Sequence, residues 1–230
     1  MRIIGIDLGS RSVKIVVFEK DNLVEKRVFN TSFFYRNYCS VTEGKVSIDF
    51  DKLNLGEFEK IISTGYGRNN VNVENAEIIL ELKAISVKGG RMVDMMLNDK
   101  CAASCGRYLE NMAAVMEISI EELVKHYKNP VQLNSTCAVF GESELIGKIS
   151  EGCSLEELAA GVNYSLFKRI SPLIERFPED CLVLTGGVAK NQAFVEYIKS
   201  ELDFKEVIVP LHPQLNGAIG CCYHYFKDKI

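Results

Sequence analysis

The chain has 230 residues and a formal net charge of −4 at pH 7; 47% of the residues are hydrophobic and 25% are charged. This composition is ordinary for a globular protein of one large domain or two smaller lobes, and it gives no reason to expect binding to nucleic acid or to an anionic membrane. The N-terminus lacks a signal-peptide pattern and no apolar run is long enough to span a bilayer, so we expect a cytoplasmic protein.

The first candidate site in chain order follows a short apolar run. The pattern predicts a strand at Arg2–Ile6, a tight turn, and a second strand at Val13–Phe18. A carboxylate that ends a buried strand beside a glycine suits Mg²⁺ or phosphate, because glycine lets a ligand approach the backbone. An ordinary hairpin turn explains the same pattern. The candidate nucleotide-binding residues of this segment are Asp7, Gly9, Ser10, Arg11, Ser12 and Lys14.

The following segment alternates expected strands and turns. The glycine-bracketed turn Thr64–Arg68 is of a kind that often lines a cleft, and Arg68 has either a structural role or a contact with a nucleotide or a partner subunit. Gly89-Gly90 has no carboxylate before it and is interpreted as a hairpin turn. The other predicted elements are a strand within Asp21–Asn30, a packed loop or helix edge at Thr31–Asp51, a strand at Phe58–Ser63, a helix at Asn75–Ala84, and hairpin strands at Ile85–Val87 and Met92–Leu97.

Two cysteines lie in similar surroundings. Cys101 and Cys105 come at or just before the start of a helix near Gly106, where unpaired N–H groups and the helix dipole favour a thiolate. Cys137 lies 36 positions after Cys101, in another polar segment that precedes a helix. Two buried core thiols and a pair of metal ligands both fit this spacing. The remaining cysteines, Cys39, Cys153, Cys181, Cys221 and Cys222, lie in no ligand-like setting, and no disulfide framework is expected in a cytoplasmic chain.

The C-terminal half predicts helices around one glycine-rich turn. Gly186 and Gly187 follow a buried strand and precede a helix, so they leave room for a nucleotide against the backbone with a helix N-terminus facing its phosphates. A strand-to-helix turn that needs two glycines is the alternative. Lys190 and Asn191 complete the candidate nucleotide residues of this turn. The predicted elements are helices at Ser119–Tyr127, Gly141–Ser150, Ser154–Ile174 and Gln192–Ser200, and strands at Cys181–Leu184 and Glu206–Pro210.

Several of these segments together resemble the activator family of 2-hydroxyacyl-CoA dehydratases, also called the BadF/BadG/BcrA/BcrD ATPase family. The resemblance implies an α/β, two-lobed fold of the actin/Hsp70/sugar-kinase (ribonuclease H-like) type, with lobes at residues 1–100 and 101–230. It also implies that Gln214 packs beside the nucleotide. The segments that carry the resemblance are Asn98–Arg107, Ser135–Glu144, Thr64–Arg68, Thr185–Asn191 and Pro213–Gly220.

The resemblance implies a set of cofactors and partners. Cys101 and Cys137 would each ligate a [4Fe-4S] cluster, and because two thiolates cannot fill four positions, two chains of a homodimer would share one cluster. The implied nucleotide is ATP or ADP with Mg²⁺. The implied function is the transfer of a low-potential electron from a ferredoxin or flavodoxin to a 2-hydroxyacyl-CoA dehydratase, a benzoyl-CoA-reductase-like enzyme or a double-cubane cluster protein.

Two departures from the family qualify this interpretation. Ser104-Cys105 stands where the family has Gly-Thr, and Cys105 is an alternative ligand, a redox neighbour or a harmless replacement; we favour the last. No segment of the type Asp-Ile-Gly-Gly-Gln-Asp follows Ala84, so the second phosphate loop is missing and the sheet of the N-terminal lobe should be truncated. Because that loop orients water and Mg²⁺ in this fold, its absence predicts that nucleotide binding survives while ATP hydrolysis is weak or lost.

The missing loop supports a second hypothesis, a regulatory or partner-binding relative that binds nucleotide and cluster without useful ATPase activity. A small-molecule kinase of the same fold is a third possibility. The kinase would need a catalytic carboxylate in a sugar-like pocket, for which the sequence offers no candidate, and it would leave Cys101 and Cys137 unexplained.

Overall fold

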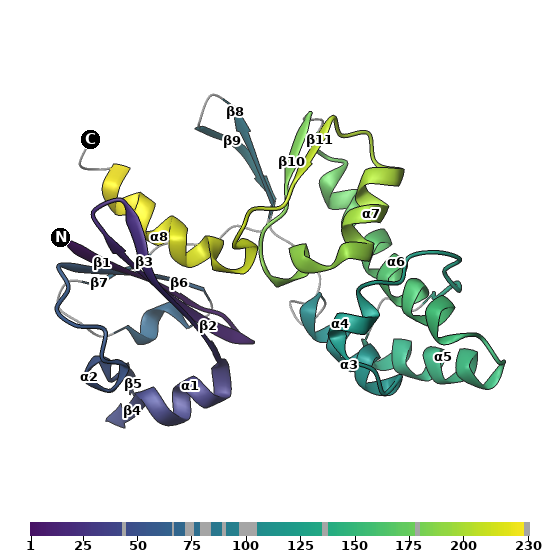
Figure 1. Ribbon diagram of the computed structural model, residues 1–230, viewed down its shortest axis with the longest axis horizontal. Coiled ribbons are helices and arrows are strands. Elements are labelled where there is room, and N and C mark those ends of the chain that lie inside the picture. Colours follow the sequence, from purple (N-terminus) through teal and green to yellow (C-terminus); the bar gives the residue numbers. More distant parts are fainter. Residues whose placement is uncertain are drawn as a thin grey trace. The chain divides into compact units, whose positions relative to one another are not determined.

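The computed structural model describes the chain except residues 43–44, 66, 72–75, 79–83, 89–90, 97–104, 135–137, 178–179 and 228–230. Two compact units make up the chain (Figure 1). Unit 1 contains Met1–Glu81 and Gln214–Ile230, and unit 2 contains Leu82–Pro213. The units differ from the predicted lobes at two places: residues 82–100 belong to unit 2, and residues 214–230, whose helix packs on the first sheet, belong to unit 1. Among the described residues, no helix is both long and apolar enough to cross a membrane.

Unit 1 is built on a five-stranded sheet with the order β3-β2-β1-β6-β7. Its first three strands are antiparallel neighbours, and the last two run parallel to β1. The first three predicted strands and the one before the glycine-bracketed turn are therefore confirmed. The strands are β1 (Arg2–Leu8), β2 (Ser12–Glu19), β3 (Asn22–Asn30), β6 (Lys60–Thr64) and β7 (Ala76–Ile78).

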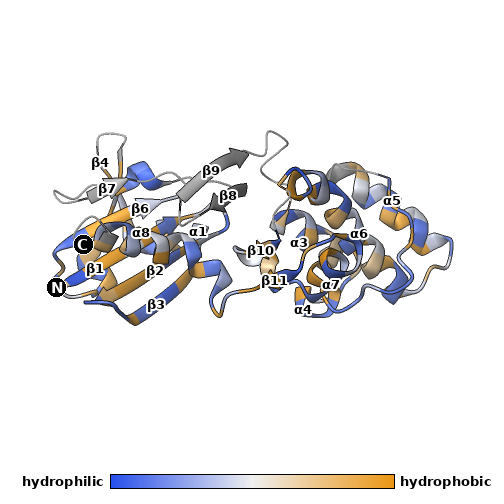
Figure 2. Cartoon of the chain, turned by 90° about the horizontal axis from the view of Figure 1, so that it is seen from above, coloured by the Kyte–Doolittle hydropathy of each residue, from blue (hydrophilic) through white to orange (hydrophobic). Residues whose placement is uncertain are grey.

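Both faces of this sheet are covered, which explains why β1 and β2 are apolar along most of their length (Figure 2). Helix α8 (Asn216–Lys227) packs on one face, where Ile3, Val16 and Ile62 are buried with Ala218. Helices α1 (Thr31–Tyr38) and α2 (Phe50–Leu53) cover the other face. Helices thus cover both faces of the sheet and hold the ends of β1 and β6 in place.

Two segments of unit 1 differ from the sequence prediction. The segment after β3, expected to be a packed loop or helix edge, forms α1, a hairpin of β4 (Cys39–Thr42) and β5 (Lys45–Ile48), and α2. Asn30 caps α1 by accepting from the N–H groups of Ser32 and Phe33. The helix predicted at Asn75–Ala84 was wrong for the residues that are described: β7 and, later, β8 occupy part of it. Pairing with β6 gives the β7 backbone its hydrogen bonds and overrides a weak helical pattern.

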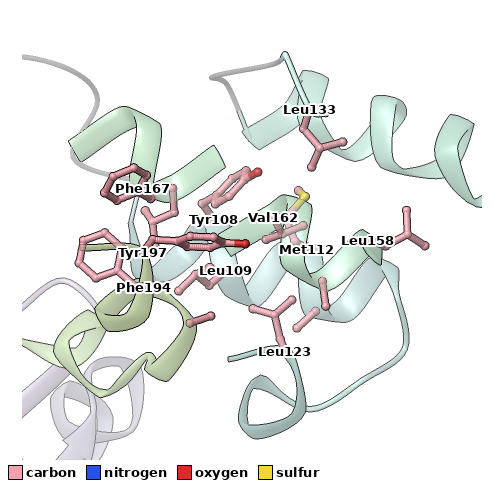
Figure 3. Close-up of a cluster of buried hydrophobic side chains, with 14 of the residues drawn as sticks. Tyr108, Leu109, Met112, Leu123, Leu133, Leu158, Val162, Phe167, Phe194 and Tyr197 are labelled. Carbon is pink, nitrogen blue, oxygen red and sulfur yellow. The ribbon is translucent and has the colours of Figure 1, made fainter. Parts of the chain in front are cut away.

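Unit 2 is a helical core with two short sheets beside it. Tyr108, Met112, Leu123, Val162 and Tyr197 belong to one buried cluster (Figure 3). The elements of unit 2 are β8 (Ala84–Lys88), β9 (Arg91–Met96), α3 (Gly106–Val115), α4 (Ile120–Leu123), α5 (Ala138–Ser150), α6 (Leu155–Ile174), β10 (Cys181–Val183), the 3₁₀ helix η2 (Gly187–Lys190), α7 (Gln192–Glu201) and β11 (Glu206–Ile208). Two further 3₁₀ helices are η1 (Arg68–Asn70) and η3 (Pro213–Leu215).

The strands of unit 2 form two separate pairs among the described residues. β8 and β9 form the predicted antiparallel hairpin, and β10 and β11 are parallel neighbours. The sequence prediction placed a truncated sheet within residues 1–100. The described part of unit 1 has a five-stranded sheet, and the last residues of that range belong to unit 2, where β8–β9 is a sheet by itself.

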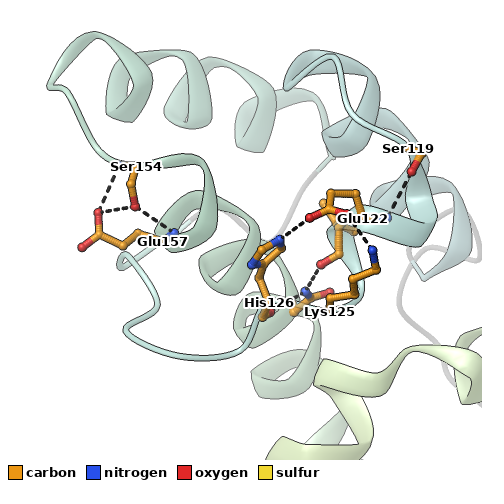
Figure 4. Close-up of polar contacts among 8 residues, drawn as sticks. Ser119, Glu122, Lys125, His126, Ser154 and Glu157 are labelled. Carbon is orange, nitrogen blue, oxygen red and sulfur yellow. Dashed lines mark hydrogen bonds and ion pairs between the residues drawn. The ribbon is translucent and has the colours of Figure 1, made fainter.

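The long helix α6 begins at the predicted capping box (Figure 4). Ser154 Oγ accepts from the N–H of Glu157, and the Glu157 carboxylate accepts from the N–H of Ser154. These hydrogen bonds hold the pKa of Glu157 below its usual range. Ser119 caps helix α4, as predicted, by accepting from the N–H of Glu122. The Glu122 carboxylate binds Lys125 and His126, and the helix ends at Leu123.

Replacing Ser154 by alanine should lower the free energy of unfolding by about 1 kcal/mol, because N–H groups at the start of α6 lose their acceptor. A carboxyl with a lowered pKa stabilises the fold above its unfolded pKa and loses that effect as the pH falls through the folded pKa. The difference between wild type and Ser154→Ala should therefore shrink in acid. Denaturant unfolding at several pH values measures it, with Ser150→Ala as the control, since the Ser150 hydroxyl bonds only carbonyls of its own helix in the described structure. Equal stability of both variants would contradict the cap.

Candidate functional site

The predicted carboxylate lies where two parallel strands of unit 1 end. Asp7 of β1 is directly opposite Thr64 of β6 in the strand register, and both are buried, with 4% and 2% exposed. Lys14 Nζ donates to Asp7 Oδ2 at 2.8 Å. The other carboxylate oxygen, Asp7 Oδ1, and the hydroxyl Thr64 Oγ1 have no hydrogen-bond partner among the residues that the structure describes. Because buried oxygens commonly have a partner, these two atoms are candidates for binding an additional group.

Two glycines keep space open around this carboxylate. A Cβ atom on Gly65 would lie 2.6 Å from Asp7 Oδ1, and the φ of +88° at Gly65 also favours glycine. A Cβ atom on Gly9 would lie 2.8 Å from the carbonyl oxygen of Ser12 and 3.1 Å from Lys14 Nζ. Ser10 and Arg11 are exposed at the tip of the turn. Glycine at positions 9 and 65 thus permits close packing around Asp7 and Lys14, where a larger side chain would collide with its neighbours.

Helix α8 packs against β1, and Gln214 belongs to the same unit. Cys222 Sγ contacts the carbonyl oxygen of Ile3 at 4.0 Å, and Ala218 lies against Gly5. Gln214 lies in η3, directly before α8. The predicted residues Asp7, Gly9, Lys14 and Gln214 therefore belong to one unit, and the position of Gln214 beside a nucleotide stays a prediction.

The second glycine-rich turn belongs to unit 2. Gly186 has a φ of +86°, and its N–H donates to the carbonyl oxygen of Pro213 at 2.7 Å. Cβ atoms built on Gly186 and Gly187 would meet nothing within 4 Å. Lys190, at the end of η2, is exposed. This turn therefore leaves open space against its backbone, as predicted for a nucleotide-binding loop.

Asn191 has a different environment from its neighbours in this turn. Its side chain is 2% exposed; it caps α7 by accepting from the N–H of Phe194, and its Nδ2 donates to Asn163 Oδ1 at 2.8 Å. Asn163 Nδ2 in turn donates to the carbonyl oxygens of Leu123 and His126. These bonds give Asn191 a structural role, and its predicted contact with a nucleotide stays a prediction.

The two predicted cluster ligands, Cys101 and Cys137, lie outside the described residues. The helices that follow them are described: α3 starts at Gly106, and α5 starts at Ala138. The first turns of these helices touch, because a Cβ on Gly141 would lie 3.5 Å from Tyr108 Cε2. In the sequence, Cys137 comes directly before α5 and Cys101 comes five residues before α3, and these two helices are neighbours. Among the described residues, no group of three or more histidine, cysteine or acidic side chains is placed to hold a metal.

Sequence reasoning missed two residues of these sites. Thr64 was considered only as part of a glycine-bracketed turn, and Asn163 was not singled out. The order of β1 and β6 in the sheet, which the sequence does not show, brings Thr64 beside Asp7. A signal was present for Thr64, since it is a polar residue that ends a predicted buried strand, as Asp7 is.

The chain resembles known proteins in both sequence and structure. The sequence profile of the BadF/BadG/BcrA/BcrD ATPase family matches residues 80–222. The 2-hydroxyisocaproyl-CoA dehydratase activator of Clostridioides difficile is 30% identical, over 99% of this chain and 96% of the activator. The structure of the Clostridium difficile activator with bound ADPNP superposes with a TM-score of 0.81 at 29% identity, covering 99% of this chain and 95% of the other.

A second solved structure gives the same result. Component A of the (R)-2-hydroxyglutaryl-CoA dehydratase of Acidaminococcus fermentans superposes with a TM-score of 0.80 at 26% identity, over the full length of both chains. The predicted α/β fold of the actin, Hsp70 and sugar-kinase type is thereby confirmed. The alignment with the Clostridioides difficile activator runs over 261 positions, so at least 31 of them have no counterpart among the 230 residues of this chain.

Proposed function

Because this chain belongs to the BadF/BadG/BcrA/BcrD ATPase family, we propose that it is an ATP-dependent activator that passes a low-potential electron to an acceptor enzyme. The acceptor is a 2-hydroxyacyl-CoA dehydratase, a benzoyl-CoA-reductase-like enzyme or a double-cubane cluster protein. A reduced ferredoxin or flavodoxin supplies the electron. Each transfer moves one electron from donor to acceptor, and hydrolysis of ATP to ADP and phosphate drives it.

The open backbone of the second glycine-rich turn is the observation that supports the nucleotide part of this proposal. A Cβ atom added to Gly186 or Gly187 would meet no described residue within 4 Å, which leaves room for the adenosine end of ATP or ADP. Asp7 and Lys14 provide a carboxylate for Mg²⁺ and an ammonium group for phosphate oxygens. The oxygen-rich pair of Asp7 and Thr64 fits the preference of Mg²⁺ for hard ligands.

The cluster part of the proposal rests on the chemistry of the donors and on the helices beside them. Cys101 and Cys137 offer two thiolates per chain, and a [4Fe-4S] cluster needs four, so a homodimer completes the set. When bound, the cluster supplies a one-electron redox centre. Each cysteine precedes a helix, and the first turns of these helices are in contact at Tyr108 and Gly141. Helix N-termini favour thiolates and so support ligation.

A second candidate function follows from the length of the alignment. At least 31 positions of the alignment with the Clostridioides difficile activator have no counterpart in this chain, although the alignment covers 99% of this chain and 96% of the activator. The sequence places the gap after Ala84, where the family carries its second phosphate loop. Without the groups that position water and Mg²⁺, nucleotide binding can persist while hydrolysis is lost. The chain would then act as a regulatory or partner-binding relative that holds nucleotide and cluster.

One experiment separates the two functions. The chain is purified without oxygen, reduced, and mixed with ATP and a 2-hydroxyacyl-CoA dehydratase; phosphate release and the redox state of the dehydratase are then measured. ATP hydrolysis that also occurs in a sample without reductant, together with reduction of the acceptor in the reduced sample, supports the activator. Nucleotide binding without hydrolysis or electron transfer supports the second function, and the absence of nucleotide binding contradicts both.

A second experiment tests the nucleotide position by replacing Gly187 with leucine. A Cβ atom at this position would meet no described residue within 4 Å, so the fold should tolerate the change. The new side chain would occupy the space proposed for the nucleotide, and affinity for an ATP analogue should fall by at least about tenfold, as measured by calorimetry. Unchanged affinity with an unchanged melting temperature would contradict the placement of the nucleotide at this turn.

A further inference from the structure

We propose that the hydroxyl group of Thr64 is a ligand, directly or through one water molecule, of the divalent cation that accompanies the nucleotide at Asp7. The proposal rests on the nucleotide-binding function argued above and adds a residue to that site. No sequence pattern had assigned Thr64 a ligand role.

The geometry places two acceptor oxygens on one face of the sheet. Asp7 and Thr64 are directly paired on the parallel strands β1 and β6, so their side chains point to the same side. Ile62, two residues before Thr64, packs under α8, and this identifies the side as the one that α8 covers. Thr64 thus lies on the face of the sheet that α8 covers, at the C-terminal end of β6.

The environment of these oxygens favours a cation. Lys14 already neutralises Asp7 Oδ2, whereas Asp7 Oδ1 and Thr64 Oγ1 are buried without a partner in the part of the chain that the structure describes. Leaving buried oxygens unpaired costs free energy, so such groups commonly acquire a partner. A phosphate at this position would meet the negative charge of Asp7 Oδ1. A hard divalent cation would meet two oxygens and keep its other positions for water and phosphate oxygens.

Neighbouring residues preserve the required space. A Cβ on Gly65 would lie 2.6 Å from Asp7 Oδ1, so any other residue at position 65 would crowd this oxygen. Ser63 shows the contrast within the same strand. Its hydroxyl donates to the carbonyl oxygen of Arg68 at 3.1 Å and is therefore used in holding the turn after β6. Two adjacent buried hydroxyls on one strand thus have different roles, and this difference supplies the control.

The test compares Thr64→Val, Thr64→Ser and Ser63→Ala. Calorimetry measures the affinity for a non-hydrolysable ATP analogue with Mg²⁺ and with chelator, and thermal unfolding measures the nucleotide-free protein. Thr64→Val should reduce the Mg²⁺-dependent gain in affinity by about 10- to 100-fold, with little change in the metal-free affinity. The same variant should melt no lower than wild type, because it removes an unpaired buried hydroxyl. Thr64→Ser should keep the gain.

Ser63→Ala should melt lower and keep the Mg²⁺-dependent gain, because its hydroxyl serves the fold. A Thr64→Val variant that keeps the gain would overturn the assignment of Thr64 and leave the nucleotide function standing. A variant that loses affinity equally with and without Mg²⁺ would also overturn it. Failure of the wild-type protein to bind the analogue at all would remove the proposed function, and this assignment with it.

Discussion

Replacing Cys101 by alanine should leave a folded chain that no longer retains an iron–sulfur cluster. Each cluster is proposed to take two thiolates from each chain, and loss of Cys101 removes two of the four ligands from a symmetric dimer. The helices that follow the cysteine segments are packed through Tyr108 and Gly141, so the helical core should survive the change. Anaerobic purification followed by counting iron and sulfide per dimer measures the effect, which should approach complete loss.

Two other cysteines provide controls for this experiment. Cys105, at the start of α3, packs partly buried against the helical core, and Cys105→Ala should keep its iron if the residue is a harmless replacement. Cys221 is fully buried under the sheet of unit 1 and is far from any ligand role, so Cys221→Ala should also keep its iron. Full iron and sulfide content in Cys101→Ala would exclude the shared cluster. Loss of iron in Cys105→Ala would instead assign Cys105 as a ligand.

Replacing Gly5 by alanine should produce the largest loss of stability in unit 1, about 3 kcal/mol. The added Cβ would lie 2.0 Å from the carbonyl oxygen of Ala218 and 2.9 Å from Cys222 Sγ. The first of these atoms belongs to the backbone of α8, so the helix must move away from the sheet. Such a shift would also move Gln214, which lies just before α8, and affinity for nucleotide should fall with stability. Thermal unfolding and calorimetry measure the two effects.

Gly220 gives a matched control on the same helix. It is exposed, and a Cβ there would meet nothing within 4 Å, so Gly220→Ala should raise stability by about 0.5–1 kcal/mol through better helix propensity. Opposite signs for these two Gly-to-Ala changes are expected. A melting temperature for Gly5→Ala equal to that of wild type would show that α8 does not pack closely on β1.

The sequence predicted those parts of the fold that depend on local patterns. The turn after Asp7, the capping box at Ser154 and the start of α3 near Gly106 all have signals within a few residues, and each is confirmed. Local signals failed where a distant partner decides the outcome. The segment that includes Ala76–Ile78 looked helical, but β6 supplies hydrogen bonds that hold it as a strand.

The candidate site shows the same division. The glycines at positions 9, 186 and 187 could be identified from their motifs, because a requirement for open backbone is visible in the residue type. The roles of Thr64 and Asn191 could not, since they depend on which strand or helix lies opposite. The proposed role of Thr64 depends on its pairing with Asp7. The Asn191 side chain points inward, where its Nδ2 donates to Asn163 Oδ1 at 2.8 Å.

Helix α4 has only four residues, and a helix of this length cannot persist by itself. Its C-terminal turn is held from outside: Asn163 binds the carbonyl oxygens of Leu123 and His126, and the N–H of Ala193 binds that of Val124. The segment leading away from Cys101 is therefore anchored to the helix that follows the second glycine-rich turn. A tilt of α7 must therefore move α4 as well, or break these buried hydrogen bonds, so the two helices should move together.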